Sequence, residues 1–300
     1  MKGVQMGSRA IRLKEFELNH DFGTSPPEHY RNVRGGAPEP RSYRIRTDAN
    51  GFMLSSERTS ESKIIGLGDS VLECMFIDEE KRLCAQIEQR LGCSAQVLNG
   101  GYSGATSLHM LNAILNKIVP IRPSGIFLMT GIMDIEAMFK KRSFWSEDVY
   151  LRPLFEINGD PGVWDQDFRD EMDVVSRLRI SASIIDVARN FGIPLSFIST
   201  PHFHDYSGAY ITQTYTVDDF PKKTLARQRA NRSLRDLCQS QSVPFFDVEE
   251  DMAHRGDLFY DDIHLNEAGA AFLVECLERS GFFDLMRSWV ATPQLPQVER

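Results

Sequence analysis

The spacing of apolar residues changes at about residue 61 and divides the chain into two regions. From there on, short apolar runs alternate with segments in which apolar residues recur every three or four positions. The short runs are typical of buried strands, and the longer spacing is typical of helices with one buried face. Strands separated by helices pair in parallel and are covered on both faces, so we predict an α/β fold with a parallel five-stranded sheet. The strands are expected over residues 63–67, 95–98, 125–129, 195–199 and 243–247.

Helices are predicted between these strands. In the first of them, Leu83, Ile87 and Leu91 lie on one face, while Asp78 is the expected N-cap and Gly92 the expected end. Ligands bind at the carboxyl ends of parallel strands, so reactive residues are expected in the loops that follow the strands. The other helices are expected over residues 108–118 (ended by Pro120), 171–190, 225–240 and from Asn266 onward.

The N-terminal region is rich in Arg, Pro, Gly, Ser and Asn and has little apolar periodicity. Residues 43–47 and 52–54 are predicted to form a β-hairpin, because Asn50 and Gly51 between them tolerate positive φ angles. The first forty residues are expected to form an extended arm or a strap over the surface of the domain.

We therefore expect three parts: an N-terminal extension over residues 1–60, one domain over 61–285 and a C-terminal tail over 286–300. Within the domain, residues 140–170 are irregular and rich in aromatic residues and Asp. We interpret this segment either as a lid that covers the substrate or as an exposed insertion.

Composition excludes several classes of protein. The 34 Lys and Arg residues against 42 Asp and Glu give a net charge of −8, and such a field attracts neither a phosphate backbone nor an anionic lipid surface. The longest apolar stretches are strand-sized, and the N-terminus lacks the apolar core of a signal peptide. We therefore predict no nucleic-acid partner and no membrane partner.

The cysteines are odd in number and include no C-x-x-C pair, which argues against a disulfide framework and against a structural zinc site. We expect reduced thiols in a cytoplasmic protein. The five residues are Cys74, Cys84, Cys93, Cys238 and Cys276.

Ser70 ends the segment Gly68-Asp69-Ser70, between the first predicted strand and a helix. A serine in this place can point its hydroxyl into a cleft, while the helix amides that follow it stabilise negative charge. The alternative is an ordinary serine at a helix N-cap.

His264 follows Asp261 by three positions, on a turn before the last predicted helix. A carboxylate at this spacing can hold one ring nitrogen and leave the other free as the base that a serine nucleophile needs. The alternative is a solvated Asp–His pair on the surface. The adjacent Asp262 leaves open which carboxylate orients the ring.

A glycine-rich segment from Asn99 to Gly104 follows the second predicted strand. Glycines let backbone amides approach a substrate oxygen closely, as an oxyanion hole requires, although a simple turn can have the same composition. The spacing is not that of a dinucleotide-binding G-x-G-x-x-G motif.

With these three segments in this order, the sequence resembles the SGNH (GDSL-type) hydrolase superfamily over about residues 61–285. The resemblance implies a flavodoxin-like, three-layer α/β/α fold and the hydrolysis or transfer of acyl groups on esters and thioesters. It implies Ser70 as the nucleophile, His264 as the base and Asp261 as the residue that orients the base. It also implies the backbone amides of Ser70 and Gly104 as oxyanion donors. Such a site needs no cofactor and no metal ion.

One residue departs from the pattern of that family. The third block of the family is Gly-x-Asn-Asp, whose Asn donates to the oxyanion, but this chain has Met133 at that position, and a thioether donates no hydrogen bond. Either a neighbouring polar side chain replaces the donor, or the substrate reacts with two backbone donors, or the protein is a weakly active member. We expect the substrate site to be lined by Asp69, Asn99, Tyr102, Thr130, Met133 and His202, of which Asn99, Tyr102 and Thr130 are the candidate replacements.

His202 and His204, followed by Asp205, come directly after the fourth predicted strand. This pattern is compatible with a metal site. We interpret it as the rim of the cleft and predict no metal ligand.

The leading hypothesis is a serine esterase that removes a short, acetyl-like O-acyl group from a carbohydrate or another polar metabolite through an acyl-serine intermediate. The carbohydrate comes from the resemblance alone, because members with a hairpin before the first block are often linked to polysaccharide modification. The alternatives are an acyltransferase with the same acyl-enzyme and a non-catalytic binding protein on the same fold. The only partner expected is the ester substrate, and the oligomeric state is open.

Overall fold

Five parallel strands form the central sheet of the computed structural model, which describes residues 11–31, 38–56, 58–92, 94–156 and 163–292. They are hydrogen-bonded in the order β5-β4-β6-β8-β9, so the direction of travel across the sheet reverses at β4. Each coincides with a predicted strand, and the predicted parallel sheet is confirmed. The strands are β4 (Lys63–Gly68), β5 (Gln96–Gly101), β6 (Gly125–Met129), β8 (Leu195–Ile198) and β9 (Phe245–Phe246).

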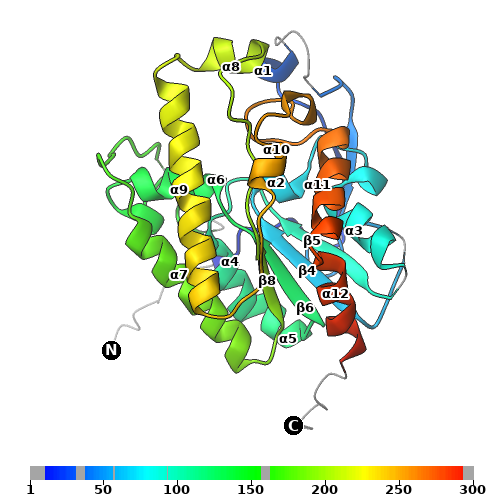
Figure 1. Cartoon of the computed structure of the whole chain (residues 1–300). Coiled ribbons are helices and arrows are strands. Elements are labelled where there is room, and N and C mark those ends of the chain that lie inside the picture. The colour runs from blue at the N-terminus through cyan, green and yellow to red at the C-terminus, as the bar shows by residue number, and fades with distance from the viewer. Residues whose placement is uncertain (1–10, 32–37, 57, 93, 157–162, 293–300) are drawn as a thin grey trace, which may run out of the picture.

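Helices cover both faces of this sheet (Figure 1). Alternate residues of β6 point to opposite faces: Phe127 and Met129 pack into one apolar layer, and Ile126 and Leu128 pack into the other. The predicted three-layer α/β/α arrangement is therefore confirmed. The first layer holds α3 (Leu83–Leu91), α11 (Glu267–Arg279) and α12 (Phe282–Ala291). The second holds α4 (Ser107–Ala113), the π-helical η2 (Ile114–Ile118), α5 (Val119–Ile121), α6 (Ile132–Phe139), α7 (Val174–Asn190) and α9 (Asp219–Ser240).

Several short elements complete the described chain. Among them, α2 begins directly after β4 and α10 follows β9. The short helices are α1 (Glu28–Arg31), α2 (Ser70–Glu73), α8 (Ala209–Thr214) and α10 (Glu249–Met252), and the 3-10 turns are η1 (Glu79–Lys81), η3 (Ser143–Trp145) and η4 (Gly256–Leu258).

Two helix starts differ from the prediction. Asp78 precedes the 3-10 turn η1 rather than α3, and its carboxylate pairs with Arg41 (2.7 Å) instead of capping a helix. The helix itself spans Leu83–Leu91, and Gly92 is its C-cap, as expected for its C-terminus. The helix α9 begins at Asp219, earlier than its apolar spacing indicated.

The prediction of a C-terminal tail over residues 286–300 is wrong for residues 286–291, because α12 continues to residue 291. Met286 and Trp289 from this helix are buried in the first apolar layer. A Cβ atom at Gly125, the first residue of β6, would lie 2.0 Å from the Trp289 ring, so the helix packs this closely only against glycine. Residues 293–300 lie outside the described part of the chain.

The N-terminal extension is attached to the domain by short antiparallel pairs of strands. The strand β1 (Ile11–Arg12) pairs with β7 (Phe155–Glu156), which belongs to the irregular segment over residues 140–170. The strand β2 (Asp21–Thr24) pairs with β3 (Tyr43–Arg46), a pairing that the sequence pattern did not reveal.

The predicted hairpin turn is present after β3. Gly51 has a φ angle of +72°, and Thr47 pairs with Met53 on the other side of the turn. Met53 also pairs with Asn99 on the edge strand β5, so backbone hydrogen bonds fasten the extension to the central sheet.

The described part of the irregular segment is held by a buried ion pair between Lys140 and Asp148 (3.2 Å). Trp145 and Trp164 are 49% and 67% exposed, so these two rings do not build a core. The role of the segment as a lid stays a prediction.

No helix among the described residues is long and apolar enough to cross a bilayer. Burial raises the pKa of the Cys74 thiol to about 11, so its reactive thiolate is scarce at neutral pH. The described cysteines, Cys74, Cys84, Cys238 and Cys276, are free and buried, and Cys93 lies outside the described residues.

Trp289→Ala should lower the free energy of unfolding by about 3–5 kcal/mol, because it leaves a cavity between α12 and β6. Urea unfolding followed by circular dichroism measures the change. Trp145→Ala is the matched control, and because that ring is half exposed its effect should stay within about 0.5 kcal/mol. Equal effects in the two variants would show that α12 lies outside the stabilising core.

Candidate active site

Ser70 is the first residue of α2 and lies at the carboxyl end of β4, where ligands bind in sheets that reverse direction. The turn is tight because a Cβ atom at Gly68 would lie 2.6 Å from the Cβ atom of Leu72. Asp69 caps α2, and its Oδ1 accepts a hydrogen bond from a helix amide (3.0 Å). Its Oδ2 accepts one from the amide of Met133 (3.2 Å). This carboxylate is buried and joins two loops, so the prediction that Asp69 contacts the substrate is wrong.

The structure brings Ser70, His264 and Asp261 into one hydrogen-bonded line. The hydroxyl of Ser70 lies 2.8 Å from Nε2 of His264, and Nδ1 of the same ring lies 2.6 Å from Oδ2 of Asp261. The other carboxylate oxygen of Asp261 accepts bonds from the amides of Ile263 (2.8 Å) and His264 (2.6 Å). The imidazole is thus held with Nδ1 toward the carboxylate and Nε2 toward the serine.

The neighbouring Asp262 points elsewhere. Its Oδ2 pairs with Arg227 and accepts a hydrogen bond from the hydroxyl of Tyr215 (3.1 Å). The carboxylate beside the His264 ring is therefore that of Asp261. The sequence alone left open whether Asp261 or Asp262 contacts the ring.

Burial and charge act in opposite directions on the His264–Asp261 pair. Burial disfavours the charged imidazole, but the Asp261 carboxylate outweighs it and raises the pKa of His264 above its usual value. Burial likewise favours a neutral Asp261, but His264 and the backbone amides outweigh it and lower the pKa of that carboxyl. The arrangement favours a transient imidazolium beside a charged carboxylate.

A tyrosine of the N-terminal extension also contacts this carboxylate. The hydroxyl of Tyr30, in α1, donates to Oδ2 of Asp261 (3.0 Å), and its ring packs edge-on against Tyr260 (5.2 Å between ring centres). Tyr260 in turn stacks on the His264 ring (5.4 Å). Sequence analysis missed Tyr30, because the weak periodicity of the extension carries no signal for a contact so far along the chain.

Gly104 lies in the loop after β5 with a φ angle of +78°. Its carbonyl oxygen accepts a hydrogen bond from Nζ of Lys14 (2.7 Å), and a Cβ atom on Gly104 would lie 2.6 Å from that nitrogen. Burial lowers the pKa of Lys14 to about 7. Lys14 of the extension therefore contacts the loop that is expected to supply an oxyanion donor. No pattern in the sequence predicted this contact of Lys14.

Asn99 and Thr130 are not free to replace the missing donor. The amide group of Asn99 donates to the carbonyl of Leu72 (3.1 Å) and accepts from the amide of Gly101 (2.8 Å). Thr130 is fully buried, and both its carbonyl and its hydroxyl face the Arg177 guanidinium (3.3 and 3.4 Å). The prediction that these two side chains line the substrate site is wrong, because the polar atoms of Asn99 bond to backbone groups and the hydroxyl of Thr130 bonds to the Arg177 guanidinium.

Tyr102 lines a pocket between the extension and the loop after β5, and its ring packs on Phe16 (4.8 Å between ring centres). Burial raises the pKa of Glu73 in this pocket to about 7, so a partly protonated carboxyl faces it at neutral pH. Tyr102 stays a predicted substrate contact. The pocket is lined by Arg12, Lys14, Phe16, Glu73, Met75, Tyr102, Ser103, Val149, Tyr150 and Phe155.

Met133 lies in the first turn of α6, and its backbone amide donates a hydrogen bond to Oδ2 of Asp69. Its half-buried side chain packs against the second apolar layer. The adjacent Asp134 is buried and accepts bonds from the amide of Ser107 (2.7 Å) and from Nε of Arg177 (3.1 Å). These bonds tie α6 to α4 and α7. Sequence analysis missed both residues. Arg177 lies in the helix predicted over 171–190, where a charged residue at an apolar position is a usable signal, but Asp134 lies in a helix that was not predicted.

His202 is fully buried, so the prediction that it lines the rim of the cleft is wrong. The amide of the next residue, Phe203, donates to the carbonyl of Asp262 (3.0 Å), which turns this loop inward. Burial lowers the pKa of His202 well below its usual value and keeps the ring neutral.

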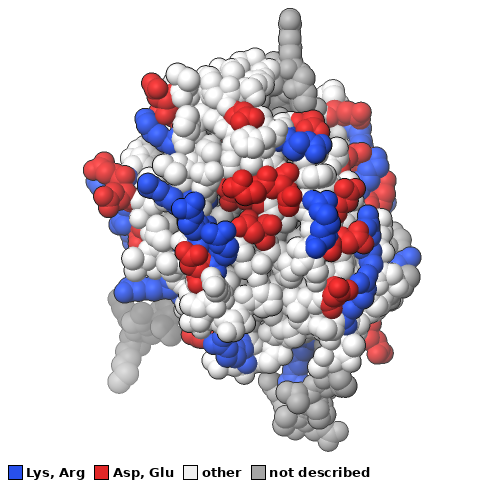
Figure 2. All heavy atoms as spheres, viewed as in Figure 1, with Lys and Arg blue, Asp and Glu red and all other residues white. Residues whose placement is uncertain are grey.

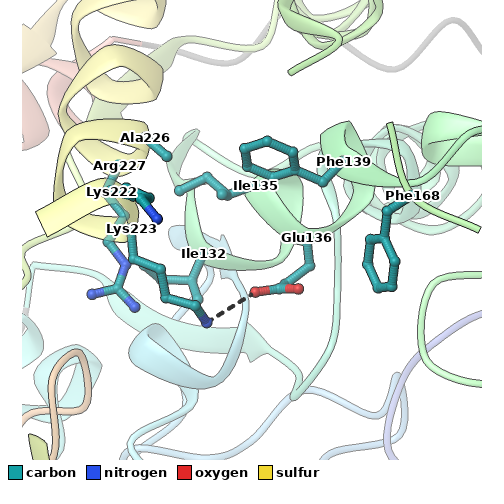
Figure 3. A pocket seen from close by; sticks show the side chains of 9 residues that line it. All are labelled: Ile132, Ile135, Glu136, Phe139, Phe168, Lys222, Lys223, Ala226 and Arg227. Carbon is teal, nitrogen blue, oxygen red and sulfur yellow. Dashed lines mark ion pairs between the residues drawn. The ribbon is translucent and has the colours of Figure 1, made fainter. Parts of the chain in front are cut away.

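A groove with an apolar floor and charged edges lies between α6 and α9 (Figure 3). Lys223 pairs with Glu136 across it (3.6 Å). Arg227 also pairs with Asp262, so the groove reaches the loop that carries the Asp–His pair. It is lined by Ile132, Ile135, Glu136, Phe139, Phe168, Lys222, Lys223, Ala226 and Arg227.

Comparisons with known proteins agree with this geometry. The model of the GDSL-like Lipase/Acylhydrolase family matches residues 67–272, about two thirds of the chain. Comparison with curated proteins gives no significant match.

Two solved structures with similar folds illustrate the relationship. A mutant of an acetyl-xylooligosaccharide esterase from Geobacillus stearothermophilus is 13% identical, with a TM-score of 0.50 over 79% of this chain and 100% of that one. An alpha/beta hydrolase from the metagenome of Lake Arreo, Spain, is 16% identical, with a TM-score of 0.50 over 75% of this chain and 98% of that one. At these identities the likeness concerns the fold alone.

Tyr30→Phe should slow covalent labelling of Ser70 by a fluorophosphonate about 2- to 10-fold, because one hydrogen bond that positions Asp261 is lost while the ring stays in place. The labelling rate reports directly on activation of the serine. Tyr43→Phe is the matched control from the same extension, since its hydroxyl donates to a backbone carbonyl of that extension (3.4 Å) and not to Asp261. An unchanged rate in Tyr30→Phe would contradict a positioning role for this hydroxyl.

Proposed function

The chain belongs to the GDSL-like lipase/acylhydrolase family, and on that premise we propose that Ser70 is the nucleophile with which it hydrolyses a short-chain O-acyl ester. The enzyme is a serine hydrolase of the SGNH type. The observation that carries the assignment of residues is the hydrogen-bonded line from Ser70 through His264 to Asp261. A serine hydroxyl is a weak nucleophile at neutral pH unless a base of this kind removes its proton.

In the proposed reaction, Oγ of Ser70 attacks the carbonyl carbon of the ester while Nε2 of His264 takes the hydroxyl proton. Asp261 accepts the Nδ1 proton in a hydrogen bond and stabilises the imidazolium. The tetrahedral intermediate collapses as His264 returns the proton to the departing alcohol, which leaves an acyl-serine. Water, deprotonated by the same nitrogen, then attacks the acyl carbon. The acid is released as the bond to Oγ breaks and His264 returns the proton to Ser70.

The oxyanion is proposed to face the backbone amides of Ser70 and Gly104. Met133 supplies no third donor, and one such donor typically contributes about 10²–10³ in kcat. A site with two donors suits a small, sterically open acyl group, because the carbonyl oxygen can approach both amides closely. We therefore assign an acetyl-like group to the acyl side of the substrate.

A carbohydrate or another polar metabolite is proposed as the alcohol. Two pockets, one lined in part by Glu73 of α2 and the other by Arg227, which pairs with Asp262, combine aromatic or aliphatic floors with cationic and acidic side chains. Such a lining offers stacking surfaces together with hydrogen-bonding groups and suits a polar molecule with apolar faces. Products formed in the presence of a competing alcohol separate hydrolysis from transfer to that alcohol.

Ser70→Ala should lower kcat for p-nitrophenyl acetate by about 10⁴-fold or more, because the attacking oxygen is removed. Steady-state kinetics measure this, and fluorophosphonate labelling should disappear in the same variant. Ser183→Ala removes a serine hydroxyl on the exposed side of α7 and should retain full activity. Activity in a folded Ser70→Ala variant close to that of the wild type would refute the assignment.

Hydrolysis should increase with pH as His264 loses its proton, since only the neutral ring accepts the proton of Ser70. The inflection should lie above about pH 6.5, the ordinary pKa of His, because Asp261 raises the pKa of the ring. Asp261→Asn should lower kcat by about 10⁴-fold. It should also move the inflection to lower pH.

The pH dependence of kcat/KM in the wild type and the variant tests this expectation. Asp262→Asn is the comparison, because that carboxylate bonds to Arg227 and Tyr215 instead of the ring. A larger loss in Asp262→Asn than in Asp261→Asn would contradict the proposed role of Asp261.

A further inference from the structure

Two histidines and a glutamate form a cluster that the proposed reaction does not use. His202 and His204 follow β8, and Glu249 is the first residue of α10 after β9. Each offers one ligand atom, and the three atoms lie within 4.8 Å of one another. The Nε2 atoms of both histidines are buried and lack a hydrogen-bond partner among the described residues. Buried polar atoms are normally bonded, so these nitrogens point to a partner other than a side chain.

The distances inside the cluster fit ligands of a single ion. Nε2 of His204 lies 3.4 Å, and Nε2 of His202 lies 3.8 Å, from the same oxygen of Glu249. Such separations are long for hydrogen bonds. Two ligands of a tetrahedral zinc ion, each about 2.1 Å from the metal, lie about 3.4 Å apart. The separation of 3.4 Å equals this value and that of 3.8 Å is slightly longer, so both are compatible with ligands of one ion.

The remaining polar atom of each side chain has its own neighbour. Nδ1 of His202 lies 3.5 Å from a backbone carbonyl oxygen, and Nδ1 of His204 lies 3.4 Å from the side-chain amide of Gln228. That amide can turn its oxygen toward Nδ1–H by rotation. Oε2 of Glu249 accepts a bond from Asn231 (2.6 Å). The bond from Asn231 is an outer contact of the kind that orients a metal ligand, and it leaves the other carboxylate oxygen of Glu249 for the ion.

The charges around the cluster favour a cation. The first turn of α10 carries Glu249, Glu250 and Asp251, and Figure 2 shows acidic side chains gathered over this part of the surface. Two cations oppose these charges, but both are paired: Arg227 near His202 with Asp262, and Arg279 with Asp251 (3.6 Å). Glu249 is therefore the carboxylate that faces the two histidine rings.

We propose that His202, His204 and Glu249 bind one divalent transition-metal ion of the zinc class. Two imidazoles and one carboxylate suit zinc, whereas magnesium and calcium prefer oxygen ligands. The ion links the loop after β8 to α10. Through the bond from the Phe203 amide to the Asp262 carbonyl (3.0 Å) it also steadies the loop that carries His264. Its role is structural, since the ligands do not contact the Ser–His–Asp line.

Calorimetric titration of the full-length, chelator-treated protein with Zn²⁺ tests the proposal. We expect one ion per chain, at least about tenfold weaker binding in Glu249→Gln and in His204→Gln, and no comparable binding of Mg²⁺. His20→Gln is the matched control, because it removes a half-exposed histidine of the extension. Ser70→Ala should bind Zn²⁺ like the wild type, so this result is independent of the proposed esterase activity.

Thermal unfolding supplies a second measurement. Zn²⁺ should raise the Tm of the wild type and of His20→Gln, and it should raise the Tm of the two ligand variants much less. Glu249→Gln keeps the size of the side chain and its bond from Asn231, which preserves the fold for the comparison. Absence of Zn²⁺ binding by the wild type, or equal binding by Glu249→Gln, His204→Gln and the wild type, overturns the proposal.

Discussion

A buried carboxylate must be fully hydrogen-bonded, and Asp261 meets this constraint with donors from two distant parts of the chain. Two backbone amides bond to one oxygen, and the His264 ring and the Tyr30 hydroxyl bond to the other. Four donors leave the carboxylate a single orientation, and the imidazole takes its own orientation from it. The hydroxyl of Ser70 then meets a ring nitrogen that is already in place. The geometry of the Ser–His–Asp line thus depends on the hydrogen bonds that the protein supplies to one buried carboxylate.

The same constraint gives neighbouring acidic residues different tasks. Asp262 bonds to Arg227 and thereby connects its loop to α9, while Asp134 bonds to Arg177 and connects α6 to α7. Buried ion pairs add little net stability, but breaking one leaves an uncompensated charge. Their effect here is to fix the spacing between helices and loops around the site. The position of the loop that carries Asp261 and His264 is in this way set by ion pairs outside the hydrogen-bonded line.

Local patterns predict most of the fold, because each strand of the central sheet and most helices have a distinct apolar spacing. The Ser–His–Asp line is also predictable, since Ser70 belongs to a short motif after β4, and Asp261 and His264 belong to a short motif before α11. Tyr30 is not, because its partner lies 231 positions away. The internal bonds of Asn99 and the burial of His202 depend on backbone groups that only the folded chain brings near. The helix α12 was not predicted as a separate helix, because it follows α11 almost directly, after Gly281.

The distances along the chain have a consequence for synthesis. Ser70 and His264 are 194 positions apart, and Tyr30 and Asp261 are 231 apart. A ribosome makes the serine long before it makes the base, and the central sheet is incomplete until β9 has been added. During most of translation the Ser70 hydroxyl therefore lacks the ring nitrogen that it contacts in the folded chain. The order of residues along the chain delays the hydrogen-bonded line from Ser70 to Asp261 until most of the domain has been synthesised.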